Sequence, residues 1–287
     1  MITPTLSAKP IPMKRYLATK VVPRVILVLM CLLFALPFYW MIVTSLKGTA
    51  ELRQFPPSLW PHDPIWRNYY DAVVFIPFFR FFFNSVILAA GATIGAVLSN
   101  ALIAYGFARI QWKGRDLLFY IAIATVFIPF PITLVALFDI FARLGWINTY
   151  LPLIVPAFFG NPFYMFLIRQ FLMGISKDLS DAARIDGAGE IKIFARIILP
   201  LMKPALAVVA IFAAVAAWND FLSPLIYLQS QELYPLSIGL QFFRSEHNVA
   251  FSLLMAASTL VVIPIIVLFI FFQRYFIEGI TVGAIKG

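Results

Sequence analysis

The chain has 287 residues, of which 62% are hydrophobic and only 12% are charged, and its formal net charge is +9. A soluble domain carries about 25% charged residues, so this composition excludes an ordinary soluble protein. The apolar residues gather into six long stretches: 25–46, 81–108, 117–138, 144–168, 204–228 (interrupted only by Asp220) and 247–273. Each stretch provides the roughly 20 residues that a helix needs to cross a bilayer.

Runs of this length exclude barrel strands, in which apolar and polar residues alternate, and in lipid only helices and closed barrels satisfy their own backbone. The sequence therefore predicts an all-α polytopic membrane protein with six transmembrane helices. The first stretch ends in Phe38, Tyr39 and Trp40, where a cleavable signal would need small residues. We expect this first helix to be retained.

Basic residues are concentrated before the first stretch and in the segments that join the second to the third and the fourth to the fifth. Such an excess marks the cytoplasmic side of a membrane protein. We therefore expect both termini to be cytoplasmic, with an N-terminal segment at 1–24, a transmembrane domain at 25–276 and a C-terminal tail at 277–287. The positive charge is explained by anionic headgroups without invoking nucleic acid.

Small residues and prolines predict how the helices pack. The first outer loop, 47–79, is rich in proline and aromatic residues and is expected on the membrane surface. Pro129 and Pro131 are expected to kink the third helix. A stripe of small residues in the second helix permits close packing, either within the chain or with another subunit: Gly91, Gly95 and Ser99.

The inner loop 174–203 is the most charged part of the chain. Ser176 is a predicted N-cap, and Asp178 and Asp181 follow it in the first turns, where acids favour the helix dipole. Gly187 is predicted to end this helix, because glycine accepts the left-handed conformation.

A second short helix is predicted at 190–199, ending at Pro200. Ile191, Phe194 and Ile198 are expected to share one apolar face of it. The loop is therefore predicted to form a rigid hairpin of two helices rather than a simple connector.

The stretch 181–188 (Asp-Ala-Ala-Arg-Ile-Asp-Gly-Ala), followed by Ile-Leu-Pro at 198–200, resembles the EAA loop of bacterial ABC importer permeases. In that family the loop docks into a cleft of the ATPase subunit and transmits its closure to the membrane helices. The resemblance implies the type I ABC importer permease fold. It also implies ATPase coupling through nine residues: Asp181, Ala182, Ala183, Arg184, Asp186, Gly187, Ile198, Leu199 and Pro200. Asp181 stands where the family usually has glutamate.

Other segments resemble the carbohydrate-uptake permeases: 45–47 (Ser-Leu-Lys), 56–61 (Pro-Pro-Ser-Leu-Trp-Pro), 104–109 (Ala-Tyr-Gly-Phe-Ala-Arg) and 218–221 (Trp-Asn-Asp-Phe). The ending at 279–287 resembles the tail of the second maltose-type permease, which reaches toward the ATPase dimer interface. That resemblance implies contacts by Thr281, Gly283, Lys286 and Gly287.

Candidate residues of a substrate path are polar groups in or near the apolar stretches: Asn219, Asp220, Asp139 and Asn100. A carboxylate at membrane depth costs a few kcal/mol unless it faces water or a partner. Asp220 and Asp139 are interpreted either as path residues or as interfacial residues that reach water. Asn84 and Asn100 are also interpreted as hydrogen-bond partners between helices.

These features predict a permease subunit of a binding-protein-dependent ABC importer for a sugar or oligosaccharide, in a bacterial or archaeal plasma membrane. The resemblance implies as partners a second unlike permease, two ATPase subunits and an extracellular or periplasmic solute-binding protein. No Gly-x-x-x-x-Gly-Lys-Ser/Thr loop occurs in the sequence, so we expect no enzyme activity, with ATP and Mg bound by the partner subunits. No cofactor or metal is expected on this chain, because His62 and His247 lie in separate outer loops.

Two alternatives remain. In the first alternative, the cargo of the importer is a non-sugar solute, such as a glycerol phosphate or a peptide. In the second, the chain is an ion-coupled secondary transporter. The second alternative predicts coupling acids deep within the helices, whereas the acids here lie at helix ends or in loops.

Overall fold

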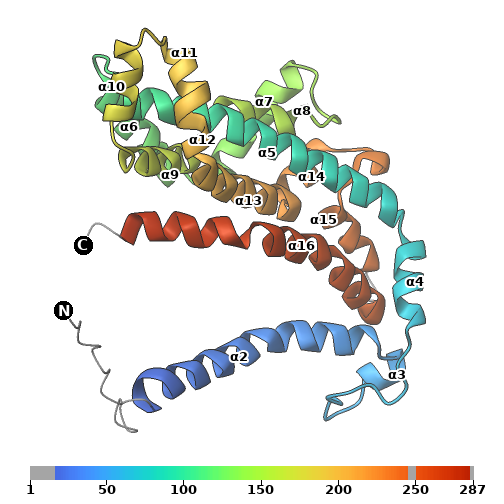
Figure 1. Ribbon diagram of the computed structural model, residues 1–287. Helices are drawn as coiled ribbons and strands as arrows, with labels where there is room; N and C mark the ends of the chain where they lie inside the picture. The colour runs from blue at the N-terminus through green and yellow to red at the C-terminus, as the bar shows by residue number, and fades with distance from the viewer. Residues whose placement is uncertain (1–16, 245–249, 285–287) are drawn as a thin grey trace, which may run out of the picture.

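The computed structural model describes residues 17–244 and 250–284, with side chains described for 19–244 and 250–274. The described residues form helices joined by turns (Figure 1). In chain order the main helices are α2 (Val22–Ser45), α3 (Thr49–Leu52), α4 (Arg67–Phe75), α5 (Phe78–Arg109), α6 (Arg115–Ala124), α7 (Phe130–Arg143), α8 (Leu151–Ile154), α9 (Pro162–Met173), α10 (Asp178–Ile185), α11 (Glu190–Ile193), α12 (Leu199–Leu201), α13 (Lys203–Asn219), α14 (Leu222–Tyr227), α15 (Leu236–Gly239) and α16 (Phe251–Ala284).

Short 3₁₀ and π segments extend several of these helices. They are η1 (Leu17–Val21), η2 (Thr125–Phe127), η3 (Val155–Phe159), η4 (Phe194–Ile198), η5 (Gln231–Leu233) and η6 (Leu240–Phe243). Within the described residues, four helices are long and apolar enough to cross a membrane unbroken, and two bent pairs raise the number of spans to six if each pair counts as one. The predicted all-α, multi-span architecture is confirmed.

The predicted kink of the third span is also confirmed. The segment formed by α6 and η2 meets α7 at an angle of 101°. Pro129 lies at this break with an extended backbone, and Pro131 lies in the first turn of α7. Proline lacks the N–H that an interior helical residue must donate. A break between helices and the first turn of a helix do not need that N–H, so both positions accept proline.

The fourth span begins later than predicted. Residues 144–150 form turns rather than a helix, and the span runs over Leu151–Met173. Gly145 and Asn148 have φ values of 68° and 63°, and this left-handed backbone interrupts a right-handed helix.

The fifth and sixth spans also differ from their predicted bounds. The apolar run 204–228 breaks at Asp220, whose extended backbone separates α13 from α14. Helix α16 continues to Ala284, so residues 277–284 of the predicted tail are helical.

Helix α5 is the centre of the packing. It contacts α9, α13 and η3 along its length (Figure 1). One hydrophobic core lies at the end of α5 nearest to α10 and α11. It contains Ile168, Leu172, Ile193 and Ile198. A second core surrounds Phe81 at the other end and includes Trp218, Leu236, Phe243 and Leu254.

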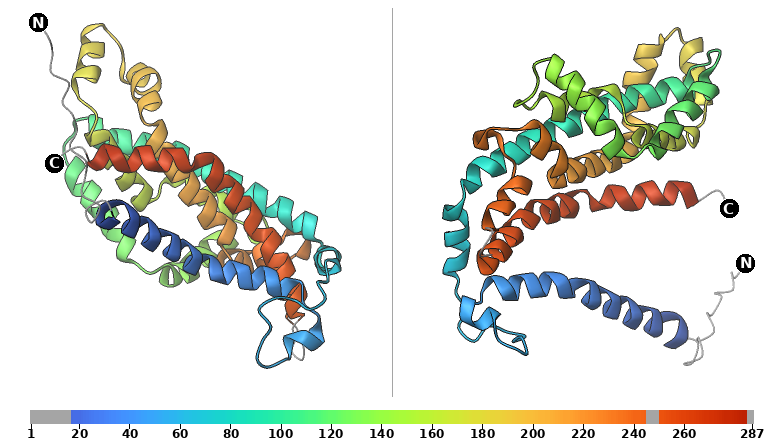
Figure 2. Two further views of the ribbon diagram at one scale, coloured as in Figure 1. Left: turned by 60° about the horizontal axis from the view of Figure 1, so that its bottom comes forward. Right: turned by 180° about the vertical axis from the view of Figure 1, so that it is seen from behind.

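Helix α2 joins the rest of the protein only near its C-terminal end. Val43, Thr44 and Ser45 are buried, whereas the large apolar side chains earlier in α2 are exposed. Figure 2 shows α2 diverging from the other helices toward its N-terminal end. The junction is held by the carbonyl of Lys47, which accepts hydrogen bonds from Asn68 Nδ2 at 3.2 Å and Ser252 Oγ at 2.6 Å.

The small-residue stripe of α5 packs within the chain. A Cβ added at Gly91 would lie 2.8 Å from Ile154, and one added at Gly95 would lie 2.6 Å from Phe158. Ser99 Oγ donates to the carbonyl of Ala157 at 2.9 Å. The stripe therefore lets α8 and η3 approach the backbone of α5.

We expect Gly95→Ala to lower the melting temperature of the purified chain in detergent, because overpacking costs about 1–3 kcal/mol. The matched control is Gly106→Ala on the same helix, where an added Cβ would have nothing within 4 Å. That control should leave the melting temperature unchanged or raise it, since alanine is the better helix former by about 1 kcal/mol. Equal shifts for the two variants would contradict this packing.

Candidate functional site: a projecting helical hairpin

The inner loop forms a hairpin that stands out from the bundle. Helix α10 is the first arm, and α11, η4 and α12 are the second. Figures 1 and 2 show the hairpin at the end of the molecule where α2 begins and α16 ends. The first outer loop, with α3 and α4, lies at the opposite end.

The first arm begins one residue later than predicted. Lys177, not Ser176, occupies the N-cap position of α10, and no side chain caps the helix there. Ser176 Oγ nevertheless accepts a hydrogen bond from the backbone N–H of Asp178 at 3.2 Å. Asp178 and Asp181 lie in the first turn as predicted.

The predicted glycine turn is confirmed. Gly187 has a φ of 78°, a conformation that costs other residues about 1–2 kcal/mol. The N–H of Ala188 donates to the carbonyl of Ala183 at 2.9 Å, and the N–H of Gly187 donates to that of Arg184 at 3.0 Å. This pair of bonds is a Schellman motif, which fixes the direction of the chain after α10.

The predicted second arm is wrong in two details. Its helical run continues past Pro200 to Leu201, because Pro200 lies in the first turn of α12, where its missing N–H is tolerated. Its buried face contains Ile193 and Ile198, whereas Ile191 is 86% exposed. The π-helical segment η4 changes the spacing between turns, so an assignment based on 3.6 residues per turn fails here.

Arg184 and Glu190 join the two arms to each other and to α5. Arg184 Nε donates to Glu190 Oε1 at 2.7 Å, and Arg184 Nη1 pairs with Asp181 Oδ1 at 2.6 Å. The other carboxylate oxygen of Glu190 accepts a hydrogen bond from the Tyr105 hydroxyl at 2.7 Å. These hydrogen bonds hold the pKa of Glu190 below its usual value, and the bond from Arg184 has a larger effect than the bond from Tyr105.

Arg109, at the end of α5, holds the root of the hairpin. Its guanidinium donates to the carbonyls of Leu172 at 2.9 Å, Ile175 at 2.8 Å and Ser176 at 3.2 Å. An arginine that binds the last carbonyls of a helix satisfies groups that have no partner within that helix. Helix α5 therefore contacts the hairpin at two places, through Tyr105 and through Arg109.

The predicted coupling residues divide into two groups. Asp181, Ala182, Arg184, Asp186 and Gly187 are exposed, whereas Ala183 and Ile198 are buried beneath the hairpin and Leu199 is half-buried. The exposed group is free to meet another molecule, and the buried group sets where the hairpin points. Pro200 is exposed on the second arm.

Two exposed isoleucines flank the turn of the hairpin. Ile185 is 87% exposed and Ile191 is 86% exposed. Beside Ile191, a shallow hollow of about 550 Å³ is lined by residues of the second arm, including Glu190, Lys192 and Arg196. The tip of the hairpin thus presents apolar side chains next to charged ones.

The four candidate path residues are held by local partners. Asn100 is fully buried, and its side chain accepts from Asn161 N–H at 2.8 Å and donates to the carbonyl of Ala96 at 2.7 Å. Asp139 pairs with Arg143 at 2.9 Å on the exposed surface of α7. Asn100 therefore packs between helices, which favours its interpretation as a structural hydrogen-bond partner.

The other two candidate residues lie at the break after α13. Asn219 Nδ2 donates to Val215 O at 2.9 Å, and Asp220 Oδ1 accepts from Ser223 N–H at 3.1 Å. This bond lies at the first turn of α14, whose N-cap position is occupied by Phe221. No hydrogen bond or ion pair joins any two of the four described candidate side chains, so the structure does not assemble them into one site.

A cavity of about 310 Å³ lies between α5, α13 and α16. Its walls are mainly apolar, with Trp218 at one side, and Thr93 contributes the single hydroxyl among the lining residues. Thr93 Oγ1 has no hydrogen-bond partner within the described structure. Neither Trp218 nor Thr93 was a predicted path residue. A single threonine among apolar side chains gives no pattern in the sequence.

The predicted contacts of the C-terminal tail are not described. Lys286 and Gly287 lie outside the described residues, and Thr281 and Gly283 belong to the part of α16 whose side chains are not described. Sequence reasoning also missed Tyr105, Arg109 and Glu190 as supports of the hairpin. Tyr105 and Arg109 lie within a matched motif, but nothing in that motif indicates their distant partners.

The spans and the projecting hairpin define a multi-pass helical membrane protein. The chain belongs to the family of binding-protein-dependent transport system inner membrane components, which it matches over residues 13–282. This membership confirms the resemblance drawn from the sequence.

Two relatives show the extent of the similarity. The chain is 35% identical over 264 residues to the arabinooligosaccharides transport system permease protein AraQ of Bacillus subtilis (strain 168), covering 90% of this chain and 93% of that protein. It is 33% identical over 279 residues to the trehalose/maltose transport system permease protein MalG of Thermococcus litoralis, covering 93% of this chain and 99% of that protein.

The fold is similar to that of a chain in the crystal structure of a bacterial ABC transporter involved in the import of the acidic polysaccharide alginate. The TM-score is 0.79 at 22% identity, covering 93% of this chain and 99% of that chain. A second match, with a TM-score of 0.61 at 17% identity, is a chain of the alginate transporter in complex with an alginate pentasaccharide-bound periplasmic protein. The predicted permease fold is thereby confirmed.

We expect Tyr105→Phe to loosen the hairpin, because it removes a hydrogen bond to a charged carboxylate that still keeps its arginine partner. A loss of about 1 kcal/mol would accelerate hydrogen exchange of the backbone amides around 183–193 about fivefold. The control is Tyr120→Phe, since Tyr120 is 69% exposed. Unchanged protection in Tyr105→Phe would show that the hydroxyl does not hold the hairpin.

The lowered pKa of Glu190 predicts a pH dependence. A carboxyl whose folded-state pKa is depressed contributes stability above its unfolded pKa and loses that contribution as the pH falls through the folded value. Protection of the hairpin amides, relative to those of α5, should therefore decline below the ordinary glutamate pKa of 4.5. Glu190→Gln should remove this dependence, and an equal acid response in both proteins would assign it to other groups.

Proposed function

We propose that this chain is one permease subunit of an ABC importer for a sugar or oligosaccharide and that its hairpin couples the membrane helices to an ATPase. The observation that carries the proposal is the hairpin itself. It is fixed to α5 through Tyr105 and Arg109, and it presents Ile185 and Ile191 almost fully exposed at its tip. A movement imposed on the tip would therefore be passed to the central helix of the bundle.

The exposed tip suits a protein partner. Large apolar side chains at the end of a rigid projection gain free energy when a partner buries them, at about 25 cal/mol for each Å² removed from water. Asp181, Asp186 and Lys192 surround them with charges that can select the partner. In this proposal two ATPase subunits bind the hairpins of two permeases and hold the ATP and Mg, and this chain binds no cofactor.

The second subunit is an unlike permease that completes the translocation path. Helix α2 supports this assignment, because its apolar side chains are exposed nearly all along it. Such a surface suits lipid together with the helices of another subunit. Switching of the path between inward-facing and outward-facing states would then be a rigid-body movement of one subunit against the other.

In this proposal the hairpin lies in the cytoplasm. The hairpin shares its end of the molecule with the start of α2 and the end of α16 (Figure 2), and the basic residues gather at this end in accordance with the positive-inside rule. Both termini are then cytoplasmic. The opposite end, with α3 and α4, meets an extracellular or periplasmic solute-binding protein in a bacterial or archaeal plasma membrane.

The proposed cargo class rests on the relatives. AraQ is a permease for arabinooligosaccharides and MalG one for trehalose and maltose. These names favour a sugar over the alternatives of a glycerol phosphate or a peptide. An importer driven by partner ATPases is also favoured over an ion-coupled transporter by the family assignment.

The test is to purify the tagged chain from its native membrane in mild detergent and to identify the co-purifying proteins by mass spectrometry. We expect an ATPase, a second permease and a solute-binding protein. The double variant Ile185→Ser/Ile191→Ser should lose the ATPase at least tenfold and keep the second permease, because both side chains are exposed and their loss leaves the fold intact. The control Leu59→Ser removes a side chain that is 72% exposed at the opposite end.

Isolation of the chain alone, or an ATPase that stays bound to the double variant, would contradict the coupling role. The recovered solute-binding protein can then be screened by calorimetry against oligosaccharides, a glycerol phosphate and peptides. Binding of an oligosaccharide would support the sugar assignment, and binding of either other class would overturn it.

A further inference from the structure

A small cavity beside the root of the hairpin is lined by four cations. It measures about 120 Å³ and lies between the end of α5, the start of α6, the end of α9 and the link to α10. Its cations are Arg109, Arg115, Arg169 and Lys177, and no acidic residue lines it.

Asp116 is the carboxylate that pairs with this group, and Asp181 acts on Arg109 from a longer distance. Asp116 pairs with Arg115 at 3.0 Å and with Arg169 at a longer 3.5 Å. Neither Arg109 nor Lys177 has a carboxylate within 4.0 Å in the described part of the chain, whereas Arg67, Arg143 and Arg184 each have their own acid. The cavity therefore carries a local excess of positive charge.

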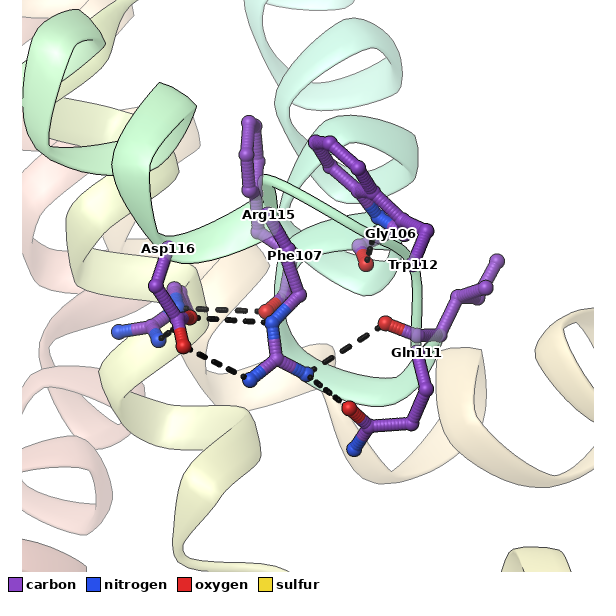
Figure 3. Close-up of polar contacts among 8 residues, drawn as sticks. Gly106, Phe107, Gln111, Trp112, Arg115 and Asp116 are labelled. Carbon is purple, nitrogen blue, oxygen red and sulfur yellow. Dashed lines mark hydrogen bonds and ion pairs between the residues drawn. The ribbon is translucent and has the colours of Figure 1, made fainter.

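The side chains are held in place before any ligand arrives. Figure 3 shows the Arg115 guanidinium between Asp116 and Gln111, where Nη1 donates to Gln111 Oε1 at 3.2 Å. Arg169 stacks on the Phe119 ring at 4.0 Å, and its side chain is only 13% exposed. Arginines fixed in this way lose little side-chain freedom when they bind an anion.

Arg109 adds a buried charge to the wall. The residue is 7% exposed, and its Nε–H is a buried donor without an acceptor in the described structure. A buried donor without a partner costs about 1–3 kcal/mol, and a charged group in such surroundings is stabilised by a nearby anion. The cavity is the adjacent space in which that anion would fit.

The sequence of the three helices around the cavity indicates headgroup depth. The uncharged run of α5 ends directly before Arg109, that of α9 ends before Arg169, and that of the third span begins after Asp116. Three spanning helices thus change from apolar to charged at one level, as happens where hydrocarbon meets the polar interface. Phe107 and Leu172 add apolar walls to the same cavity.

We propose that this cavity binds a phosphate anion, supplied by the headgroup of an anionic phospholipid. Basic pockets between transmembrane helices on the cytoplasmic side suit such headgroups, and guanidinium groups match phosphate oxygens with paired hydrogen bonds. Because Arg109 also binds the carbonyls at the root of the hairpin, the lipid would stabilise the position of the hairpin. The site requires neither a particular cargo nor a bound ATPase.

The test uses the full chain, freed of lipid in dodecyl maltoside and titrated with phosphatidylglycerol or phosphatidylcholine, with the bound lipid counted by native mass spectrometry. Phosphatidylglycerol should bind more tightly than phosphatidylcholine. Lys177→Gln should weaken phosphatidylglycerol about fivefold, as expected for one cation at a membrane surface. Lys177 is exposed and outside any ion pair of the described residues, so this change leaves the fold intact. Lys113→Gln is the control, because Lys113 lies on the link between α5 and α6 but does not line the cavity.

A parallel titration with inorganic phosphate distinguishes the two sources of the anion. In one outcome, phosphate raises the melting temperature, Lys177→Gln abolishes this rise, and phosphatidylglycerol is not retained. That outcome would keep the phosphate site but assign it to a free anion instead of a lipid. Two results would overturn the proposal. One is equal binding of the two lipids together with no effect of phosphate, and the other is phosphatidylglycerol binding that Lys177→Gln leaves unchanged.

Discussion

The close packing of α5 against its neighbours is the interaction on which the rest of the structure depends. Small residues along α5 let η3 reach its backbone, and a methyl group at Gly95 would collide with Phe158. Helix association in lipid relies on such contacts, because apolar side chains gain little by leaving an apolar solvent. With α9 and α13 also packed along it, α5 is the rigid element to which both ends of the protein are attached.

The hairpin draws its role from this attachment. Its arms are joined by Arg184 and Glu190, Glu190 is joined to α5 by Tyr105, and Arg109 holds its root. A loop joined to the bundle by its two chain ends alone would absorb a push from a partner. A hairpin fixed at several points moves with α5, which is the mechanical requirement for coupling in the proposed importer. The proposed lipid site acts on the same root through Arg109.

The basic residues of the inner surface therefore have different roles. Arg184 is structural, because it pairs with carboxylates within the chain, whereas Arg109 both satisfies carbonyls at the root of the hairpin and borders the cavity. Arg169 and Lys177 border the cavity, where the positive charges outnumber the carboxylates that pair with them. Counting the Lys and Arg residues of each segment, as the positive-inside rule does, does not separate these roles. Only the distances to individual acceptors do so.

The sequence by itself determined the membrane class, the approximate spans, the proline break after η2, the glycine turn of the hairpin and the family. Each of these depends on composition or on local backbone preference, which short segments carry without help from distant residues. Only the tertiary structure decided that Ile193 rather than Ile191 is buried, since the π-helical η4 changes the periodicity, and that Asn100 is enclosed between helices. It alone brought Tyr105 to Glu190, 85 residues apart, because a contact between distant segments is set by how whole helices pack.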